Sequence, residues 1–187
     1  MRGDDRGQAF TLEGFIGSML ILTAVLFALQ SIIITPTTSG TVDRDVQSGI
    51  EREAEDVLTQ ERNNGTLKTQ VLNVTDNGYG SSSAIGYAPD DPPGGFGETL
   101  NGTFTQRGRV YNVIVEFRAN DSDAGNTVSS LEEEMVYRGV PADSAVVATE
   151  TVVIYDDDVS NPDNFPVPDT APESPIYTVA EVRLVVW

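Results

Sequence analysis

The chain has 187 residues, of which 29 are acidic and 11 basic, so its net charge at pH 7 is −18. A surface this acidic repels nucleic acid, and we expect no nucleic-acid partner. The chain contains no cysteine and no histidine. This excludes disulfides, thiolate chemistry, and imidazole as a base or a zinc ligand.

The acidic charge is concentrated beyond the N-terminus. The first 35 residues hold three acids and two bases, so the rest of the chain carries 26 acids and nine bases, a net charge of −17. Concentrated salt screens such self-repulsion, because the Debye length falls to about 3 Å at 1 M. The composition therefore favours a halophilic source over an ordinary acidic protein.

A short polar leader, residues 1–7, precedes a long apolar run. From Gly14 to Ile34 there are 21 residues without a charge, and as a helix they would cover about 30 Å, the hydrocarbon thickness of a bilayer. No small-x-small cleavage site follows the run, which argues against a removed secretory signal. We predict a cytoplasmic leader at 1–7 and a transmembrane or filament-core helix at 8–35.

Two signals predict the orientation. Arg2 and Arg6 lie on the short N-terminal side and favour placing it in the cytoplasm. Four possible N-glycosylation sequons all lie beyond the apolar run. Together they predict a single-pass protein of the cell membrane with an extracellular, glycosylatable C-terminal domain. The sequons are at Asn64, Asn73, Asn101 and Asn120.

The residues at the start of the run carry a family resemblance. Arg6-Gly7 is followed by Gln8-Ala9-Phe10-Thr11-Leu12-Glu13 and then by the apolar span. This segment resembles the type IV pilins and the archaeal class III signal peptide proteins. The resemblance implies cleavage between Gly7 and Gln8 by a prepilin peptidase-like enzyme. Such a cut puts Glu13 at the sixth mature position, and matching FTLE to the bacterial start puts it at the fourth, where the family has its Glu at the fifth.

The same resemblance implies how the helix assembles. In the family, the Glu pairs with the free N-terminal ammonium of a neighbouring subunit, a role that falls here on Glu13. A simpler alternative is that Glu13 lies at a helix N-terminus close to water, where negative charge is favoured. Gly14, Gly17 and Ser18 would let another helix approach closely. The expected partners are membrane lipid and other pilin-like subunits.

Residues 36–63 are predicted to form a stalk. Pro36 disfavours helix at the residue before it, and a helix is expected from Asp43 to Gln60. Within it, apolar residues recur every three or four positions, which predicts one apolar stripe. The family resemblance implies a stalk that continues the span and packs its stripe on a sheet. The stripe consists of Val42, Val46, Ile50, Ala54, Val57 and Leu58.

Residues 64–187 are predicted to form a β-rich domain. In the segment 110–118 alternation places Tyr111, Val113, Val115 and Phe117 on one face. Consecutive strands predict an antiparallel sheet packed on the stalk helix, an α+β fold. The chain is expected to stop inside its last strand. The candidate strands are residues 67–74, 110–118, 135–138, 145–155 and 177–187.

Two segments, residues 76–108 and 156–175, are rich in Gly, Ser, Pro and Asp and are predicted to be irregular. The first contains Tyr79, Tyr87, Phe96 and Phe104. These aromatic side chains could anchor a partner, but covering the sheet is the role we favour.

No chemical site is predicted. The segment 121–127 with Glu132 follows part of a calcium-loop register, but Gly125 replaces a ligand and Asn126 replaces the turn glycine. No nucleophile motif accompanies any serine. We therefore expect no enzyme, cofactor or metal. The sequence favours a pilin-like subunit, of the minor kind, for filament assembly, adhesion or surface display. The alternative is an uncleaved single-pass envelope protein whose ectodomain binds a ligand or partner.

Overall fold

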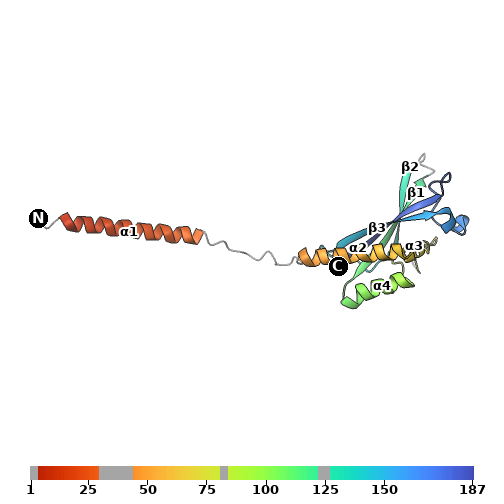
Figure 1. The fold of residues 1–187 in the computed structure, drawn as a ribbon, viewed down its shortest axis with the longest axis horizontal. Coiled ribbons are helices and arrows are strands. Elements are labelled where there is room, and N and C mark those ends of the chain that lie inside the picture. Colours follow the sequence, from red (N-terminus) through yellow and green to blue (C-terminus); the bar gives the residue numbers. More distant parts are fainter. Residues whose placement is uncertain (1–3, 30–43, 81–83, 122–126) are drawn as a thin grey trace. The chain divides into compact units, whose positions relative to one another are not determined.

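A computed structural model describes residues 4–29, 44–80, 84–121 and 127–187 of the chain (Figure 1). The chain divides into two units, Met1–Gly40 and Thr41–Trp187, and each is described by itself. In the first unit the described element is helix α1 (Asp4–Leu29). The remaining helices and strands belong to the second unit, whose described part, from residue 44 onward, we call the globular domain.

Helix α1 occupies most of the segment predicted as the N-terminal helix. Within the described residues, no helix combines the length and the apolar character that crossing a membrane requires. The last part of the predicted span, residues 30–35, lies outside the described residues. The predicted break at Pro36 and the continuity of the span with the stalk also lie outside them.

The globular domain is built on a four-stranded antiparallel sheet, which confirms the predicted α+β class. The strand order is β2-β1-β4-β3. Two hairpins, β1 with β2 and β3 with β4, are joined through pairing of the central strands β1 and β4. The strands are β1 (Tyr111–Asp121), β2 (Thr127–Val136), β3 (Val146–Tyr155) and β4 (Ile176–Val186).

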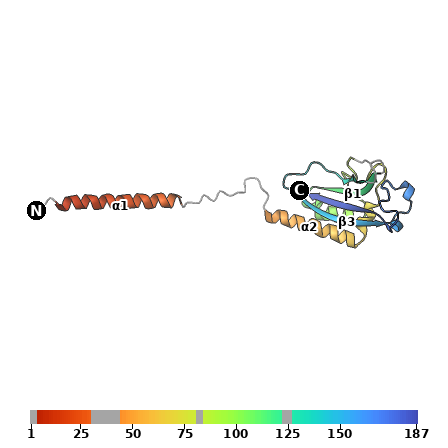
Figure 2. The same cartoon turned by 90° about the horizontal axis from the view of Figure 1, so that it is seen from above.

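One face of the sheet forms the core. The four residues predicted to share a face of β1, Tyr111, Val113, Val115 and Phe117, are all fully buried. Alternate residues of β4 are also buried, because successive side chains of a strand point to opposite faces. Helices α2, α3 and α4 contribute further core residues, as do β2, β3 and the loops, and α2 runs beside β3 (Figure 1 and Figure 2). The buried β4 residues of this set are Ala180, Val182, Leu184 and Val186.

The predicted stalk helix is α2 (Arg44–Asn63), which begins one residue after the expected start and ends three after the expected end. Its stripe packs as predicted at Ala54, Val57 and Leu58, which are buried, and at Ile50, which packs against the core. Val42 lies outside the described residues, and the exception is Val46, in the first turn of the helix, which is 49% exposed.

Three strand and loop predictions were wrong. Residues 67–74 do not form a strand: α3 (Thr66–Val71) occupies the segment, and its buried Leu67, Gln70 and Val71 follow a helical period. The segment 76–108 is not irregular throughout, because it contains α4 (Gly95–Thr103) and a 3-10 turn, η1 (Thr105–Arg107). The candidate strand 135–138 is the end of β2, which begins at Thr127 and ends at Val136.

Two glycines that lie very close to another part of the backbone explain part of these errors in prediction. An ideal Cβ on Gly97 would lie 1.7 Å from the carbonyl oxygen of Pro92, so α4 packs where only glycine fits. Gly86 has a φ of +60° and pairs with Val136 of β2, and its Cβ would lie 2.1 Å from the Met135 oxygen. Both glycines therefore suggest loops in the sequence, whereas in the structure they allow close packing against another part of the backbone.

The second irregular segment, residues 156–175, has no strand and only two 3-10 turns, η2 (Asp156–Asp158) and η3 (Pro162–Asn164). The aromatic residues of the first segment cover the sheet, the role that the sequence favoured. Tyr79, Phe96 and Phe104 are fully buried, and Tyr87 packs half-buried against the core.

Candidate functional site

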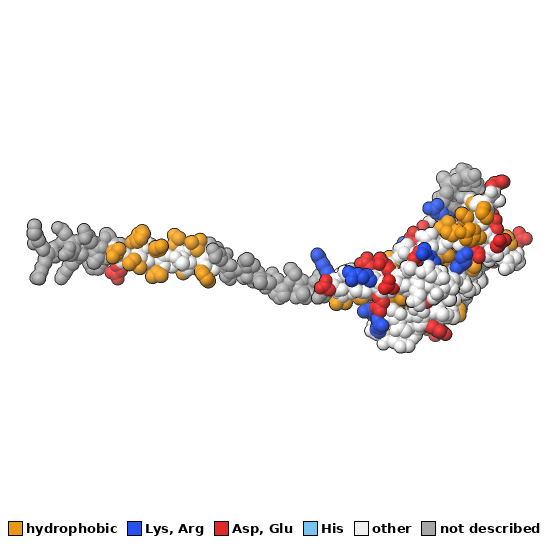
Figure 3. All heavy atoms as spheres, in the orientation of Figure 1, with side chains coloured by type: hydrophobic (Ala, Val, Ile, Leu, Met, Phe, Trp, Pro, Cys, Tyr) orange, Lys and Arg blue, Asp and Glu red, His pale blue; other side chains and the backbone are white. Residues whose placement is uncertain are grey.

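Helix α1 exposes large apolar side chains along its described length (Figure 3), and the spacing of these residues distributes them around the whole helix. Ten large apolar residues between Leu12 and Phe27 are between 49% and 78% exposed. An amphipathic helix of a globular domain confines such residues to one stripe, whereas a helix that is apolar all round is buried in other protein or in lipid. The ten residues are Leu12, Phe15, Ile16, Met19, Leu20, Ile21, Leu22, Val25, Leu26 and Phe27.

The predicted assembly residues lie together on α1. Gly14, Gly17 and Ser18 are spaced three and four apart, so they share a face of the helix. A Cβ on either glycine would meet nothing within 4 Å. Glu13 is exposed beside this face, and Gly7 and Gln8, the predicted cleavage pair, lie within the helix.

Two hydroxyl side chains of α1 are satisfied by the backbone of the helix itself. The Ser18 hydroxyl donates to the Phe15 carbonyl at 2.8 Å, and the Thr23 hydroxyl donates to the Met19 carbonyl at 2.8 Å. Such bonds to the preceding turn satisfy a hydroxyl where water is absent. Both groups are therefore compatible with an apolar environment.

The four sequons fall into different environments. Asn64 and Asn73 are exposed, and the side chain of Asn120 lies outside what the structure describes. Asn101 is half-buried, and its amide nitrogen donates to the Asp91 carboxylate at 2.6 Å. A glycan would replace one of the two hydrogens of that nitrogen in a half-buried site, so the exposed Asn64 is the better placed acceptor, whereas the Asn73 amide nitrogen donates to Gln70 at 3.4 Å.

A second candidate site, which the sequence analysis missed, is an open groove of about 800 Å³ on the globular domain. We call it the arginine-lined groove. Its walls are mainly apolar, two guanidinium groups reach it, and no carboxylate is among the described residues that line it. The residues that define it are Ile85, Pro89, Val110, Tyr137, Arg109 and Arg138.

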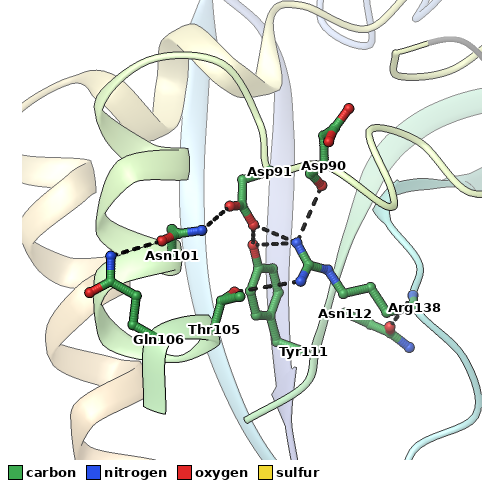
Figure 4. Close-up of polar contacts among 8 residues, drawn as sticks. All are labelled: Asp90, Asp91, Asn101, Thr105, Gln106, Tyr111, Asn112 and Arg138. Atoms are coloured by element: carbon green, nitrogen blue, oxygen red, sulfur yellow. Dashed lines mark hydrogen bonds and ion pairs between the residues drawn. The ribbon is translucent and has the colours of Figure 1, made fainter. Parts of the chain in front are cut away.

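A polar network holds Arg138 at the groove (Figure 4). Its guanidinium donates to Asp91 and, at 3.1 Å, to the Tyr111 hydroxyl, and it lies 4.3 Å from the centre of the Tyr111 ring. Tyr111 also donates to Asp91. Asn112 supports the same segment, because its side chain accepts from the Arg138 backbone N–H at 2.8 Å.

The network shifts the titration of two of its members. Burial alone raises the pKa of Asp91, but hydrogen bonds from Tyr111 and Asn101 and the charge of Arg138 outweigh it, so the pKa lies below its ordinary value. Burial, followed by the hydrogen bond to Asp91, raises the pKa of Tyr111 well above its ordinary range. At neutral pH the network therefore holds an ionised carboxylate and a neutral phenol.

Arg109 is held by a second ion pair. Its Nη1 lies 2.6 Å from the Glu53 carboxylate on α2, and Arg107 binds the other oxygen of the same carboxylate. Arg109 and Arg138 are thus paired with Glu53 and Asp91, which do not line the groove, so its described lining presents two arginines and no carboxylate in a strongly acidic chain. In the sequence, Arg107 and Arg109 stand out because basic residues are scarce in this chain. No pattern in the sequence indicated that residues 85–89 and 137–139 would lie beside them in the fold.

The described residues of the two sites include no metal-binding cluster. Among the residues that the structure describes, no three His, Cys, Asp or Glu side chains lie close enough together to hold a metal ion. The arrangement offers apolar contact and cation-to-carboxylate pairing, which are the chemistry of binding and assembly.

The fold and these surfaces define an α+β protein with an apolar N-terminal helix and a separate acidic domain. The chain belongs to the Family of unknown function (DUF7288), whose model matches residues 6–186. A protein of Archaeoglobus fulgidus, described as an uncharacterized protein, is 28% identical over 187 residues, which cover 98% of this chain and 93% of the relative. No solved structure matches the chain.

Proposed function

We propose that this chain is a type IV pilin-like surface subunit of a halophilic archaeon, of the minor kind, for filament assembly, adhesion or surface display. Residues 8–35 would form the membrane-spanning or filament-core helix, and the globular domain would face outward. The observation that carries the proposal is the exposure of large apolar side chains on every side of α1. Exposed apolar area of this extent requires lipid or other helices to cover it.

Further observations support the proposal. The uncharged run from Gly14 continues to Ile34, beyond the last described residue of α1. The amphipathic α2 packs on an antiparallel sheet, as the pilin resemblance implies. The family match and the archaeal relative extend over both α1 and the globular domain, so the two units occur together in related chains.

The N-terminus of the mature chain tests the proposal. Mass spectrometry of protein purified from membranes of a prepilin-peptidase-containing host should find a chain that begins at Gln8. Substitution Glu13→Ala should abolish salt-resistant oligomers of that mature chain. Glu51→Ala, which removes an exposed carboxylate from α2, is the matched control and should leave the oligomers intact. A full-length chain that is soluble and monomeric without detergent would refute the proposal.

The second candidate is an uncleaved single-pass envelope protein with a binding ectodomain. The arginine-lined groove favours it, because a mainly apolar groove with two cations suits an amphipathic anion. A purified chain that keeps residues 1–7 and stays monomeric in detergent would favour this candidate over the pilin-like subunit.

A further inference from the structure

The sheet places two surfaces of opposite charge at its two ends. At one end Val110 and Trp187 exchange backbone hydrogen bonds at 3.0 Å, and Val110 lines the arginine-lined groove. At the other end Tyr155 pairs with Ile176, and between them lie residues 156–175, which we call the acidic loop. The ten residues of β3 separate the ends by about 30 Å. The two surfaces therefore cannot meet within one molecule.

The acidic loop has the charge that the groove lacks. It contains six acidic residues and no lysine or arginine. Four of the six are exposed: Asp156, Asp157, Asp163 and Glu173.

The loop is also held in a defined position. The Phe165 ring packs edge-on against Tyr177 at 5.7 Å, Val167 is fully buried, and Asp158 forms a 2.6 Å ion pair with Lys68. A pre-ordered segment loses little entropy on binding.

The groove has hydrogen-bond donors that can bind an incoming carboxylate. Arg109 uses Nη1 on Glu53, which leaves further donors of its five N–H groups. Of the Arg138 guanidinium, Nη2 is already bonded to Asp91 and Tyr111 and Nε is buried, so Arg109 supplies the donors that remain for an incoming carboxylate. Around these donors Ile85 and Val110 are 40% and 36% exposed, so apolar area is also available. Guanidinium groups pair well with carboxylates at interfaces that are partly dry.

We propose that the acidic loop of one copy of this chain docks into the arginine-lined groove of the next copy, head to tail. The inference rests on the proposed assembly of the chain and names one of its contacts. Because the two surfaces differ and lie at opposite ends of the sheet, the contact is heterologous. Repetition of a heterologous contact produces an open row of subunits unless the rotation closes a ring.

Concentrated salt suits this contact. Two copies whose residues 36–187 each carry a net charge of −17 repel each other at long range, and a Debye length of about 3 Å at 1 M removes that repulsion. Contact between a carboxylate and a guanidinium acts within that distance, and apolar burial is not weakened by screening. We therefore expect docking to be weak in dilute buffer and stronger at high salt.

Single-cysteine variants test the contact, because the chain has no cysteine of its own. Val110→Cys marks the groove, and the exposed Asn164→Cys marks the loop without removing an acid. The two full-length variants are mixed in lipid vesicles at high salt and treated with a short bis-maleimide. Cross-linking between them should be several-fold above that of the control pair Thr149→Cys and Asn164→Cys, since Thr149 is exposed in mid-sheet. Equal yields would overturn the proposal.

Two further variants sharpen the result. A chain carrying both Val110→Cys and Asn164→Cys should give a ladder of multimers, whereas dimers alone would contradict a head-to-tail contact. Replacing Asp156, Asp157 and Asp163 by asparagine should lower the yield several-fold, and an unchanged yield would count against charge pairing. If Val110→Cys fails to fold, Val140→Cys takes its place, because Val140 is 82% exposed beside the groove residue Gly139.

The outcome separates this inference from the proposed function. A mature chain that begins at Gln8 and forms oligomers dependent on Glu13, but gives no link between positions 110 and 164, would refute the docking alone. A chain that keeps its leader but gives the cross-link would refute the pilin-like processing and leave the contact standing.

Discussion

Helix α1 and helix α2 use apolar residues in opposite ways. In α2 the buried residues Ala54, Val57 and Leu58 lie on one face, and acidic residues cover the exposed face. In α1 large apolar residues are exposed on all sides, and Gly14 to Leu29 carry no charge. The stability of α2 comes from packing on the sheet, whereas α1 has no such partner within the described part of its unit. The comparison shows that the chain joins a domain that buries its own apolar residues to a helix whose apolar residues remain exposed within the described part of its unit.

The largest expected effect is on the domain and comes from shortening its last strand. Val186 pairs with both Tyr111 and Val146, and Trp187 pairs with Val110. Deleting residues 185–187 removes these bonds from a central strand together with buried apolar area. We expect loss of the cooperative thermal transition of the globular domain, measured by circular dichroism on the full chain. Helical signal from α1 should remain. A truncated chain with an unchanged transition would contradict this role of β4.

A pair of phenylalanine substitutions compares the core of the globular domain with the exposed surface of α1 directly. Phe117 is fully buried in β1, and Phe15 is 67% exposed on α1. We expect Phe117→Ala to lower the free energy of unfolding of the globular domain by about 3–5 kcal/mol, because it leaves a cavity. Phe15→Ala should leave that free energy unchanged and weaken partition into lipid vesicles. Denaturant titration and vesicle flotation measure the two effects. A similar loss of domain stability in both variants would break the comparison.

These contrasts also explain what could be predicted from the sequence. The strands β1, β3 and β4 could be predicted because period-two alternation, as in Tyr111 to Phe117, directly reflects burial on one face. Helix α4 could not, because Gly95 and Gly97 signal a loop, and the tight approach of Gly97 to Pro92 is visible only in the fold. Most of strand β2 could not be predicted, because three successive glutamates, 132–134, interrupt the alternation of apolar residues in this edge strand.

The two candidate sites also differ in whether they could be predicted from the sequence. The assembly residues of α1 are contiguous in the sequence, so Glu13, Gly14, Gly17 and Ser18 could be named in advance. The arginine-lined groove draws Pro89, Arg109 and Arg138 from three separate segments. Only tertiary structure brings them together, and no local pattern marks their meeting.

Glycine substitutions give a smaller effect that sharpens the comparison within one helix. A Cβ on Gly97 would lie 1.7 Å from the Pro92 oxygen, whereas a Cβ on Gly102, also in α4, would meet nothing within 4 Å. We expect Gly97→Ala to destabilise the globular domain by about 1–3 kcal/mol through overpacking. Gly102→Ala should be neutral or stabilising by a few tenths of a kcal/mol, because alanine favours helix. Denaturant titration of both variants tests this, and equal stabilities would show that α4 can shift away from Pro92.

The smallest expected effect is a pH dependence that belongs to the domain and not to α1. The folded-state pKa of Asp91 is lowered, so its contribution to stability is fully present above the unfolded-state pKa and is lost as pH falls through the folded-state pKa. The unfolding free energy of the wild-type domain should therefore fall on acidification below about pH 4. In Asp91→Asn this fall should be smaller, because the titrating group is gone, although stability at pH 7 should be lower than in the wild type.

Asp163→Asn, which removes an exposed carboxylate from the acidic loop, is the matched control and should keep the wild-type slope. Chemical denaturation between pH 7 and pH 3 measures the slopes, and an identical slope in Asp91→Asn would show that the ion pair with Arg138 contributes nothing to acid sensitivity.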